Sequence, residues 1–441
     1  MILKDRALKK SGTLLRLVDL GLFDILGSSV VNRIISFVSG MVVVRLIPQA
    51  EYGVYGYAYN LLNIALLFNG LGASSAVLQL ASERAFEGRG QDVEYYGLRF
   101  GVVADILLLM VMLVAPFFVD FPVKGSEYLF RLFCITPMLQ FICDLQLVSL
   151  RSVLRNREYA LATNINTALM LIGSVAGAFI GGAPGLILGR TTATATTCVV
   201  LFAKFGVPYS LGSFHRQNSN CEGALPKNGL TRKEKKDFLS VAAASALAAG
   251  FNQLVFYLGT ALIGSLTSDA SSVALYQTTL AIPLALSFIP NSLAIFVYPY
   301  FAKHKDDSDW VIRRYLQLTG VSAVVSLAIS VAVSVFAPLI LIFTYGSDYV
   351  GAAPALRILM FGWFFSATLR TLGSNLLVTQ RRMWFIVNMS IASIVLISAL
   401  SFALVPSMGI EGAAWAQTAV YIITGFGYSG YFVMSLRKKR R

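Results

Sequence analysis

Two arginines lie deep inside apolar stretches of the chain. Arg33 and Arg370 each fall near the middle of a segment long enough to cross a membrane. A charged residue at the centre of a membrane helix costs about 2.5–3.5 kcal/mol on insertion scales, so it normally faces a cavity or a partner. A guanidinium can hold phosphate oxygens in a bidentate geometry. Both arginines are therefore candidates to bind an anionic substrate, and the alternative is an intramembrane ion pair.

Three carboxylates also fall at or inside apolar segments, namely Asp24, Asp105 and Asp144. Any of them could bind H⁺ or Na⁺ and act as the ion-coupling group if a change of conformation altered its surroundings. The structural alternative is a tertiary ion pair with an arginine. We favour the ion pair for each, because carboxylates inside a membrane protein are normally paired.

Polar amides in the apolar segments form a third group. Asn32, Asn252 and Gln253 could bind sugar hydroxyls, or they could hydrogen-bond between helices at about 0.6 kcal/mol each. The two interpretations are evenly balanced for Asn32 and Asn252. Arg45 ends the stretch that holds Asn32, where it could reach the interface or cap the last carbonyls. We favour that structural role and keep Arg45 among the substrate-binding candidates.

Membrane helices are the elements that must position these side chains. The 441 residues are 56% hydrophobic and only 13% charged, with a mean hydropathy of +0.69. A soluble chain of this length would carry more charge. The first apolar stretch follows several basic residues and has no cleavage site after it, so we expect it to be a retained span. The composition predicts an all-α polytopic membrane protein.

The pattern predicts twelve transmembrane helices in two six-helix lobes. We expect an N-terminal lobe over residues 1–204, a basic cytoplasmic linker over 205–236, and a C-terminal lobe with a basic tail over 237–441. The predicted spans cover residues 23–47, 53–80, 93–118, 127–150, 159–181, 184–204, 237–266, 270–302, 311–343, 352–379, 382–405 and 410–436.

The placement of positive charge predicts the orientation. The net charge is +14, and most Lys and Arg residues fall between apolar segments that share one side if both termini are cytoplasmic. Only Lys124 falls clearly in an outer loop. This distribution matches the positive-inside rule and argues against nucleic-acid binding.

No motif indicates catalysis or a resident cofactor. The four cysteines have no CxxC spacing and the chain has two histidines, so we expect no metal centre. No GxxxxGK[ST] loop is present, which argues against nucleotide-driven transport. We therefore expect a protein that is not an enzyme and needs no cofactor beyond a coupling ion.

The chain carries an internal duplication. Asn32 corresponds to Asn252 and Tyr55 to Tyr276, while further matches follow in the same order. These matches are Ala115-Pro116 with Ala337-Pro338, Gly125-Ser126 with Gly346-Ser347, and Gly182 and Gly185 with Gly409 and Gly412. Both halves run in the same direction, so the repeats are parallel. Such pseudo-symmetric lobes enclose a central cavity and give alternating access by rocking.

The residues that lead from the first span into the second form a recognisable pattern. They are Arg45-Leu46-Ile47-Pro48, then Glu51-Tyr52-Gly53-Val54-Tyr55, and later Gly70-Leu71-Gly72. Ala274-Leu275-Tyr276-Gln277 is the second-half counterpart. The pattern resembles the polysaccharide transporter (Wzx-like flippase) family of the multidrug/oligosaccharidyl-lipid/polysaccharide exporter superfamily, over essentially the whole chain.

The resemblance implies a flippase for an undecaprenyl-pyrophosphate-linked oligosaccharide repeat unit in the bacterial inner membrane. The product would be exopolysaccharide, capsule or the O-antigen of lipopolysaccharide. Implied partners are the lipid-linked glycan, membrane lipids, and the polysaccharide polymerase and export machinery. One departure is notable, because relatives often carry an acidic residue where this chain has Asn252-Gln253. Ion coupling would then use another residue or be absent.

Two alternatives remain open. A multidrug efflux antiporter shares the fold, but a cavity for cationic drugs should be acidic or apolar. In this chain the excess of charged residues near the middle of the spans is basic. A membrane-embedded glycan polymerase or ligase would need a sizeable outer loop with catalytic groups. The predicted outer loops are short and contain no histidine.

Overall fold

The computed structural model describes residues 22–85, 90–153, 155–205, 230–304, 307–380 and 382–440. Every regular element in these ranges is helical. Most of the predicted linker lies outside the described residues, as do the side chains of Asp24 and Asn252. The all-helical prediction is confirmed for the described part of the chain.

The chain divides into two compact units. The first unit comprises Met1–Leu46, Ala65–Val119 and Tyr128–Ala249, and the second comprises Ile47–Ile64, Asp120–Glu127 and Gly250–Arg441. The division cuts α9 (Arg232–Thr267), which continues past residue 249, and it also falls within the first turn of α6 and before the last residue of α3.

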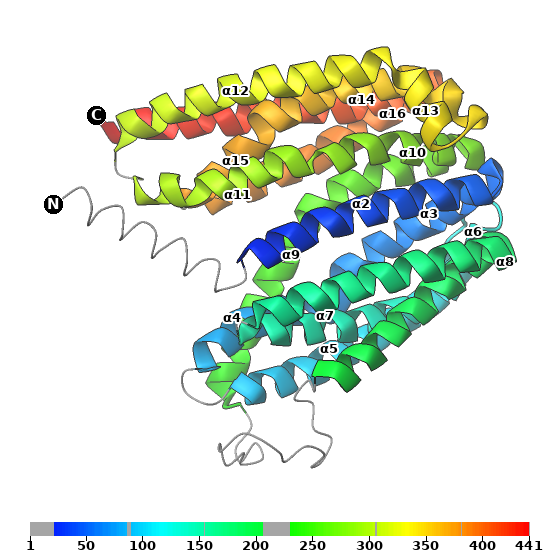
Figure 1. Ribbon diagram of the computed structural model, residues 1–441, viewed down its shortest axis with the longest axis horizontal. Helices are drawn as coiled ribbons and strands as arrows, with labels where there is room; N and C mark the ends of the chain where they lie inside the picture. The colour runs from blue at the N-terminus through cyan, green and yellow to red at the C-terminus, as the bar shows by residue number, and fades with distance from the viewer. Residues whose placement is uncertain are drawn as a thin grey trace. The chain divides into compact units, whose positions relative to one another are not determined.

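The helices of the first unit are mostly long (Figure 1). They are α2 (Leu22–Leu46), η1 (Leu66–Gly72), α4 (Ala73–Ala85), α5 (Gly90–Phe118), α6 (Ser126–Leu132, chiefly in this unit), α7 (Thr136–Ser152), α8 (Asn156–Phe205) and the first part of α9. Within this unit α2 and α7 lie against α8, while α4, α5 and α7 pack against one another.

The second unit contains the remaining elements. They are α3 (Gln49–Ala65), the second part of α9, α10 (Ala270–Leu286), α11 (Phe288–Lys303), α12 (Ser308–Val335), α13 (Ala337–Thr344), η2 (Ser347–Ala352), α14 (Ala353–Phe365), η3 (Ser366–Arg370), α15 (Thr371–Thr379) and α16 (Met383–Arg440). Figure 1 shows α12, α14 and α16 running side by side in this unit.

Seven helical stretches in the described residues are long and apolar enough to cross a membrane, and an eighth results if α6 and α7 count as one bent span. All seven stretches are longer than the roughly 20 residues of a single crossing, and two of them are long enough for two crossings. The backbone of α8, 50 residues long, leaves the helical conformation at Gly181 and Gly182. The backbone of α16, 58 residues long, does so at Gly409. The chain is thus a multi-span membrane protein whose longest helices are bent at glycine.

The two arms of α8 pack with their backbones in contact. A Cβ atom at Gly177 would lie 2.2 Å from the carbonyl oxygen of Gly185, and one at Gly173 would lie 2.3 Å from that of Gly189. Small residues at such spacing permit close helix approach in a membrane, where no hydrophobic force drives helices together. The left-handed φ of +57° at Gly182 lets the chain reverse between the arms.

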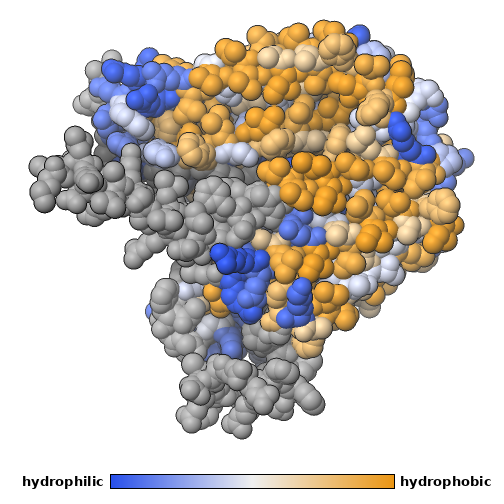
Figure 2. All heavy atoms as spheres, viewed as in Figure 1, coloured by the Kyte–Doolittle hydropathy of each residue, from blue (hydrophilic) through white to orange (hydrophobic). Residues whose placement is uncertain are grey.

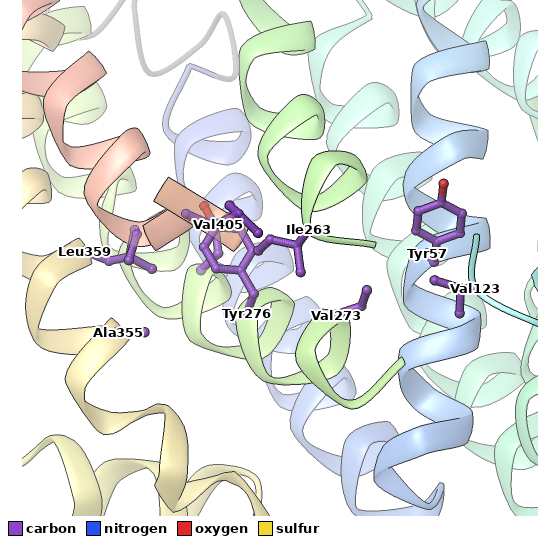
Figure 3. Packing of buried hydrophobic residues seen from close by; sticks show 11 residues of the cluster. Tyr57, Val123, Ile263, Val273, Tyr276, Ala355, Leu359 and Val405 are labelled. Atoms are coloured by element: carbon purple, nitrogen blue, oxygen red, sulfur yellow. The ribbon is translucent and has the colours of Figure 1, made fainter. Parts of the chain in front are cut away.

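The core of the second unit forms around Tyr276 of α10. Figure 3 shows this side chain with Ile263 of α9 and Val405 of α16 nearby, and all three are buried in one cluster with Leu359 of α14. The helix begins at Asp269, whose side chain accepts hydrogen bonds from the backbone N–H groups of Ser271 and Ser272. The Ser272 hydroxyl also donates to this carboxylate, and these bonds lower the pKa of Asp269.

Apolar side chains cover the outer faces of the helices. On α12 the exposed residues include Leu316, Val321, Val324, Leu327 and Val331. On the face seen in Figure 2, hydrophobic side chains cover the middle of α12 and hydrophilic ones gather near helix ends. This distribution is typical of helices that contact lipid tails along their length.

We expect Gly177→Val to destabilise the protein, because the new side chain would overlap the Gly185 carbonyl. Overpacking of this kind costs about 1–3 kcal/mol, and the midpoint of thermal unfolding in detergent would fall. Gly320→Ala is the control, since a Cβ at Gly320 meets nothing within 4 Å. Equal unfolding midpoints for both variants would contradict the backbone contact described for α8.

Candidate functional site

Arg370 is the last residue of η3, a π-helical turn within the helical run from Ala353 to Thr379. The Thr371 N–H donates to the Ser366 carbonyl, five residues back, instead of the four of an α-helix. Turns of this type are rare and frequently occur at functional sites. Of the two arginines in this run, Arg357 and Arg370, only Arg370 lies in the π-helical turn.

Two aromatic rings flank the guanidinium of Arg370. Its Cζ atom lies 5.5 Å from the centre of the Phe256 ring on α9 and 5.6 Å from that of Tyr421 on α16. Aromatic faces stabilise a cation without neutralising it. Phe256 and Tyr421 were not among the residues predicted from the sequence. Both are far from Arg370 along the chain, so that the sequence alone does not show that they are its neighbours.

No carboxylate pairs with Arg370 among the described residues, and its buried Nε has no hydrogen-bond partner there. The alternative of an intramembrane ion pair therefore finds no support in the described part of the chain. The side chain is half-buried. A charge with two aromatic neighbours and an unused N–H donor can accept an anionic ligand.

Arg33 is exposed on α2, in the first unit. No hydrogen bond or ion pair joins it to another described residue. Asn32 beside it is half-buried, and Arg45 is exposed in the last turn of the same helix. Gln253 is exposed on α9. Within the second unit, the side chain of Gln253 makes no hydrogen bond or ion pair with Arg370, whereas Asn32, Arg33 and Arg45 belong to the first unit.

Asp105 has a partner that the sequence analysis did not predict. Its side chain is fully buried on α5, and its Oδ1 accepts a hydrogen bond from the Gly70 N–H at 2.8 Å. Its Oδ2 is buried without a hydrogen-bond partner. The favoured ion pair is absent among the described residues, and a backbone donor takes its place.

Gly70 lies in a break of the second predicted span. Asn69 is extended (ψ 124°), and Gly70 and Leu71 are left-handed, with φ of 53° and 45°. The Asn69 side chain donates to the Pro137 carbonyl at 3.1 Å. Such a break exposes backbone groups that must find partners where no water is available. The Gly-Leu-Gly motif therefore has a physical reason, and Asp105 is one of the groups that hold it.

Asp144 differs again from its expected role. Its side chain is exposed on α7 and makes no ion pair with any described residue. The neighbouring Cys143 and Leu145 are buried. The ion pair favoured for Asp144 from the sequence is therefore absent among the described residues. Within the described ranges no group of three or more His, Cys, Asp or Glu side chains could hold a metal ion.

The fold matches solved transporters along nearly the whole chain. An inward-facing multidrug resistance MATE-family transporter aligns with a TM-score of 0.76 and 15% identity, covering 93% of this chain and 95% of that one. The lipid II flippase MurJ, inward closed, aligns with a TM-score of 0.70 and 13% identity, covering 94% and 87%. The chain therefore has the fold of the multidrug/oligosaccharidyl-lipid/polysaccharide exporter superfamily.

A third similar structure is a superfamily transporter from Pyrococcus furiosus, whose binding pocket is described as reversed in polarity, suggesting a different function. Its TM-score is 0.63 at 15% identity, with 96% of each chain covered. A search of curated protein sequences gave no match. The model of the family described as "polysaccharide biosynthesis protein" matches residues 42–354. The chain belongs to this family, which confirms the resemblance found in the sequence.

The role of Asp105 in the helix break can be separated from its charge. We expect Asp105→Asn to have a midpoint of thermal unfolding close to that of the native protein, because an amide oxygen can still accept the Gly70 N–H. Asp105→Leu would leave that buried N–H unpaired, which costs about 1–3 kcal/mol. Thermal unfolding of the purified variants measures the difference. A leucine variant as stable as the asparagine variant would show that the hydrogen bond does not hold the break.

Proposed function

We propose that the protein is a flippase for an undecaprenyl-pyrophosphate-linked oligosaccharide repeat unit, acting in exopolysaccharide, capsule or O-antigen assembly. The observation that carries the proposal is Arg370, a half-buried arginine between two aromatic rings with no acidic partner among the described residues. A pyrophosphate supplies the missing negative charge. Membership of the polysaccharide biosynthesis family favours a glycan as the rest of the cargo.

The proposed architecture has twelve spans in two lobes, with both termini in the cytoplasm of a bacterial cell. The bends at Gly181–Gly182 and Gly409 support counting α8 and α16 as two crossings each. In this proposal the two lobes rock about a central cavity, so that the substrate headgroup crosses while the lipid tail stays in the membrane. Arg33 and Arg370 hold the pyrophosphate, and Asn32, Asn252, Gln253 and Arg45 are candidate contacts for the glycan.

Coupling to an ion is a separate part of the proposal. Asp105 has one buried carboxylate oxygen without a partner, and Asp144 is exposed within the first unit. Either could bind H⁺ or Na⁺, whereas the side chain of Asp24 lies outside the described residues. If Asp105 carries the coupling proton, Asp105→Asn keeps the fold and abolishes the dependence of export on the proton gradient.

Multidrug efflux is the second candidate function, because the fold also aligns with a MATE-family transporter. The charge of the candidate site disfavours cationic drugs as substrates, since Arg370 would repel them. A glycan polymerase or ligase is the weakest alternative, because the predicted outer loops are short.

The test of the function is the location of lipid-linked glycan in a deletion strain. We expect full-length undecaprenyl-linked repeat units to accumulate on the cytoplasmic face, with loss of surface polymer. Normal surface polymer together with increased sensitivity to cationic drugs would overturn the proposal and favour efflux.

Single substitutions test the role of the arginine. We expect Arg370→Gln to reduce polymer export about tenfold or more, the loss that follows when a charge-assisted hydrogen bond of ~1.4 kcal/mol disappears. Arg357→Gln is the matched control, because Arg357 lies in the same run of helices, is exposed, and donates from Nε to the Ser334 carbonyl. Surface polymer and membrane protein level are measured together. If a variant with both Arg33→Glu and Arg370→Glu exported polymer normally at a normal protein level, the role of these arginines in binding pyrophosphate would be refuted.

A further inference from the structure

The π turn that ends at Arg370 has carbonyl groups bonded by other helices. The Ala367 carbonyl accepts a hydrogen bond from the Ser322 hydroxyl of α12 at 3.3 Å. The Leu369 carbonyl accepts one from the Ser429 hydroxyl of α16 at 3.0 Å. Both serines are buried. The hydrogen-bond pattern of this turn departs from that of an α-helix, and the two serine hydroxyls tie its carbonyl groups to α12 and α16.

A second hydrogen bond fixes the Ser429 hydroxyl. A serine has one O–H to donate, and Ser429 donates it to the Leu369 carbonyl. The Tyr315 hydroxyl of α12 donates in turn to Ser429 Oγ at 2.6 Å. Tyr315 is 2% exposed, and its ring lies against Phe432 with the ring centres 4.8 Å apart. The result is a relay of two hydrogen bonds from α12, through α16, to the carbonyl next to Arg370.

The geometry of the turn decides where Arg370 points. A π turn contains one residue more than an α-helical turn, and one residue corresponds to a rotation of about 100° around the helix axis. If the turn relaxed to an α-helix, Arg370 would rotate by this amount relative to α14. The guanidinium would then leave the space between Phe256 and Tyr421.

We propose that Tyr315 and Ser429 are positioning residues of the anion site, and that their hydroxyl relay keeps the π turn in the form that aims Arg370 at the substrate. The proposal rests on the proposed function, because it requires Arg370 to bind the anionic part of the cargo. Tyr315 and Ser429 themselves do not touch the substrate. They act through the Leu369 carbonyl, one residue before the arginine.

The experiment measures binding by the full-length protein in lipid nanodiscs. The probes are undecaprenyl pyrophosphate and the uncharged lipid undecaprenol, and the variants are Tyr315→Phe, Ser429→Ala and Arg370→Gln. Ser330→Ala is the matched control, because Ser330 is also buried on α12 and donates to the Met360 carbonyl at 2.8 Å, outside the π turn. Thermal unfolding is recorded for each variant, so that affinities are compared only between folded proteins.

We expect Tyr315→Phe and Ser429→Ala to weaken the binding of undecaprenyl pyrophosphate by roughly threefold to tenfold and to leave the binding of undecaprenol unchanged. Ser330→Ala should bind both lipids with the affinity of the native protein. Because the relay acts through Arg370, adding Ser429→Ala to Arg370→Gln should cause no further loss of affinity. That non-additivity is a result that a merely structural role would not produce.

Two outcomes overturn the proposal in distinguishable ways. If Arg370→Gln weakens pyrophosphate binding but the relay variants match Ser330→Ala, or if their losses add to that of Arg370→Gln, the relay is not a positioning device and the proposed function stands. If Arg370→Gln itself leaves binding unchanged, the pyrophosphate role of Arg370 fails, and the relay proposal fails with it.

Discussion

The constraint on which the structure depends is that backbone N–H and C=O groups inside a membrane need partners within the protein. A regular helix meets this requirement by itself, but a break does not. Two irregular segments, the break at Gly70 and the π turn that ends at Arg370, have hydrogen-bond partners on other helices. Asp105 and Asn69 secure the break at Gly70, and Ser322 and Ser429 bond to the π turn before Arg370. The irregular segments are thus specific structures stabilised by distant residues.

These supported breaks lie where the candidate functional groups are. In the first unit the break in the second predicted span is next to a buried carboxylate with an unpartnered oxygen. In the second unit the π turn ends in a half-buried arginine with aromatic neighbours. A charge held in this way remains available for a ligand, because its surroundings stabilise it without an opposite charge. This accounts for how a membrane protein can keep an unpaired guanidinium at a fixed position.

The sequence was sufficient to predict the helical class, the family and the position of Arg370 within a span, since each follows from local composition or a short motif. It predicted ion pairs for Asp105 and Asp144, which the described residues do not form. The reason is that pairing depends on which helices become neighbours. The π turn could not be predicted from the sequence either, because its hydrogen bonds join Ser322 and Ser429 to carbonyl groups 45 and 60 residues away.

The most direct test of flippase activity through Arg370 is transport by the purified protein in liposomes that contain the host's own lipid-linked repeat unit. A lectin or glycosidase added outside reports how much glycan has crossed to the outer leaflet. We expect crossing with the native protein, a strong reduction with Arg370→Gln, and no effect of Arg357→Gln. Equal crossing with the native protein and Arg370→Gln would contradict the role of Arg370, and no crossing above that in protein-free liposomes would contradict flippase activity.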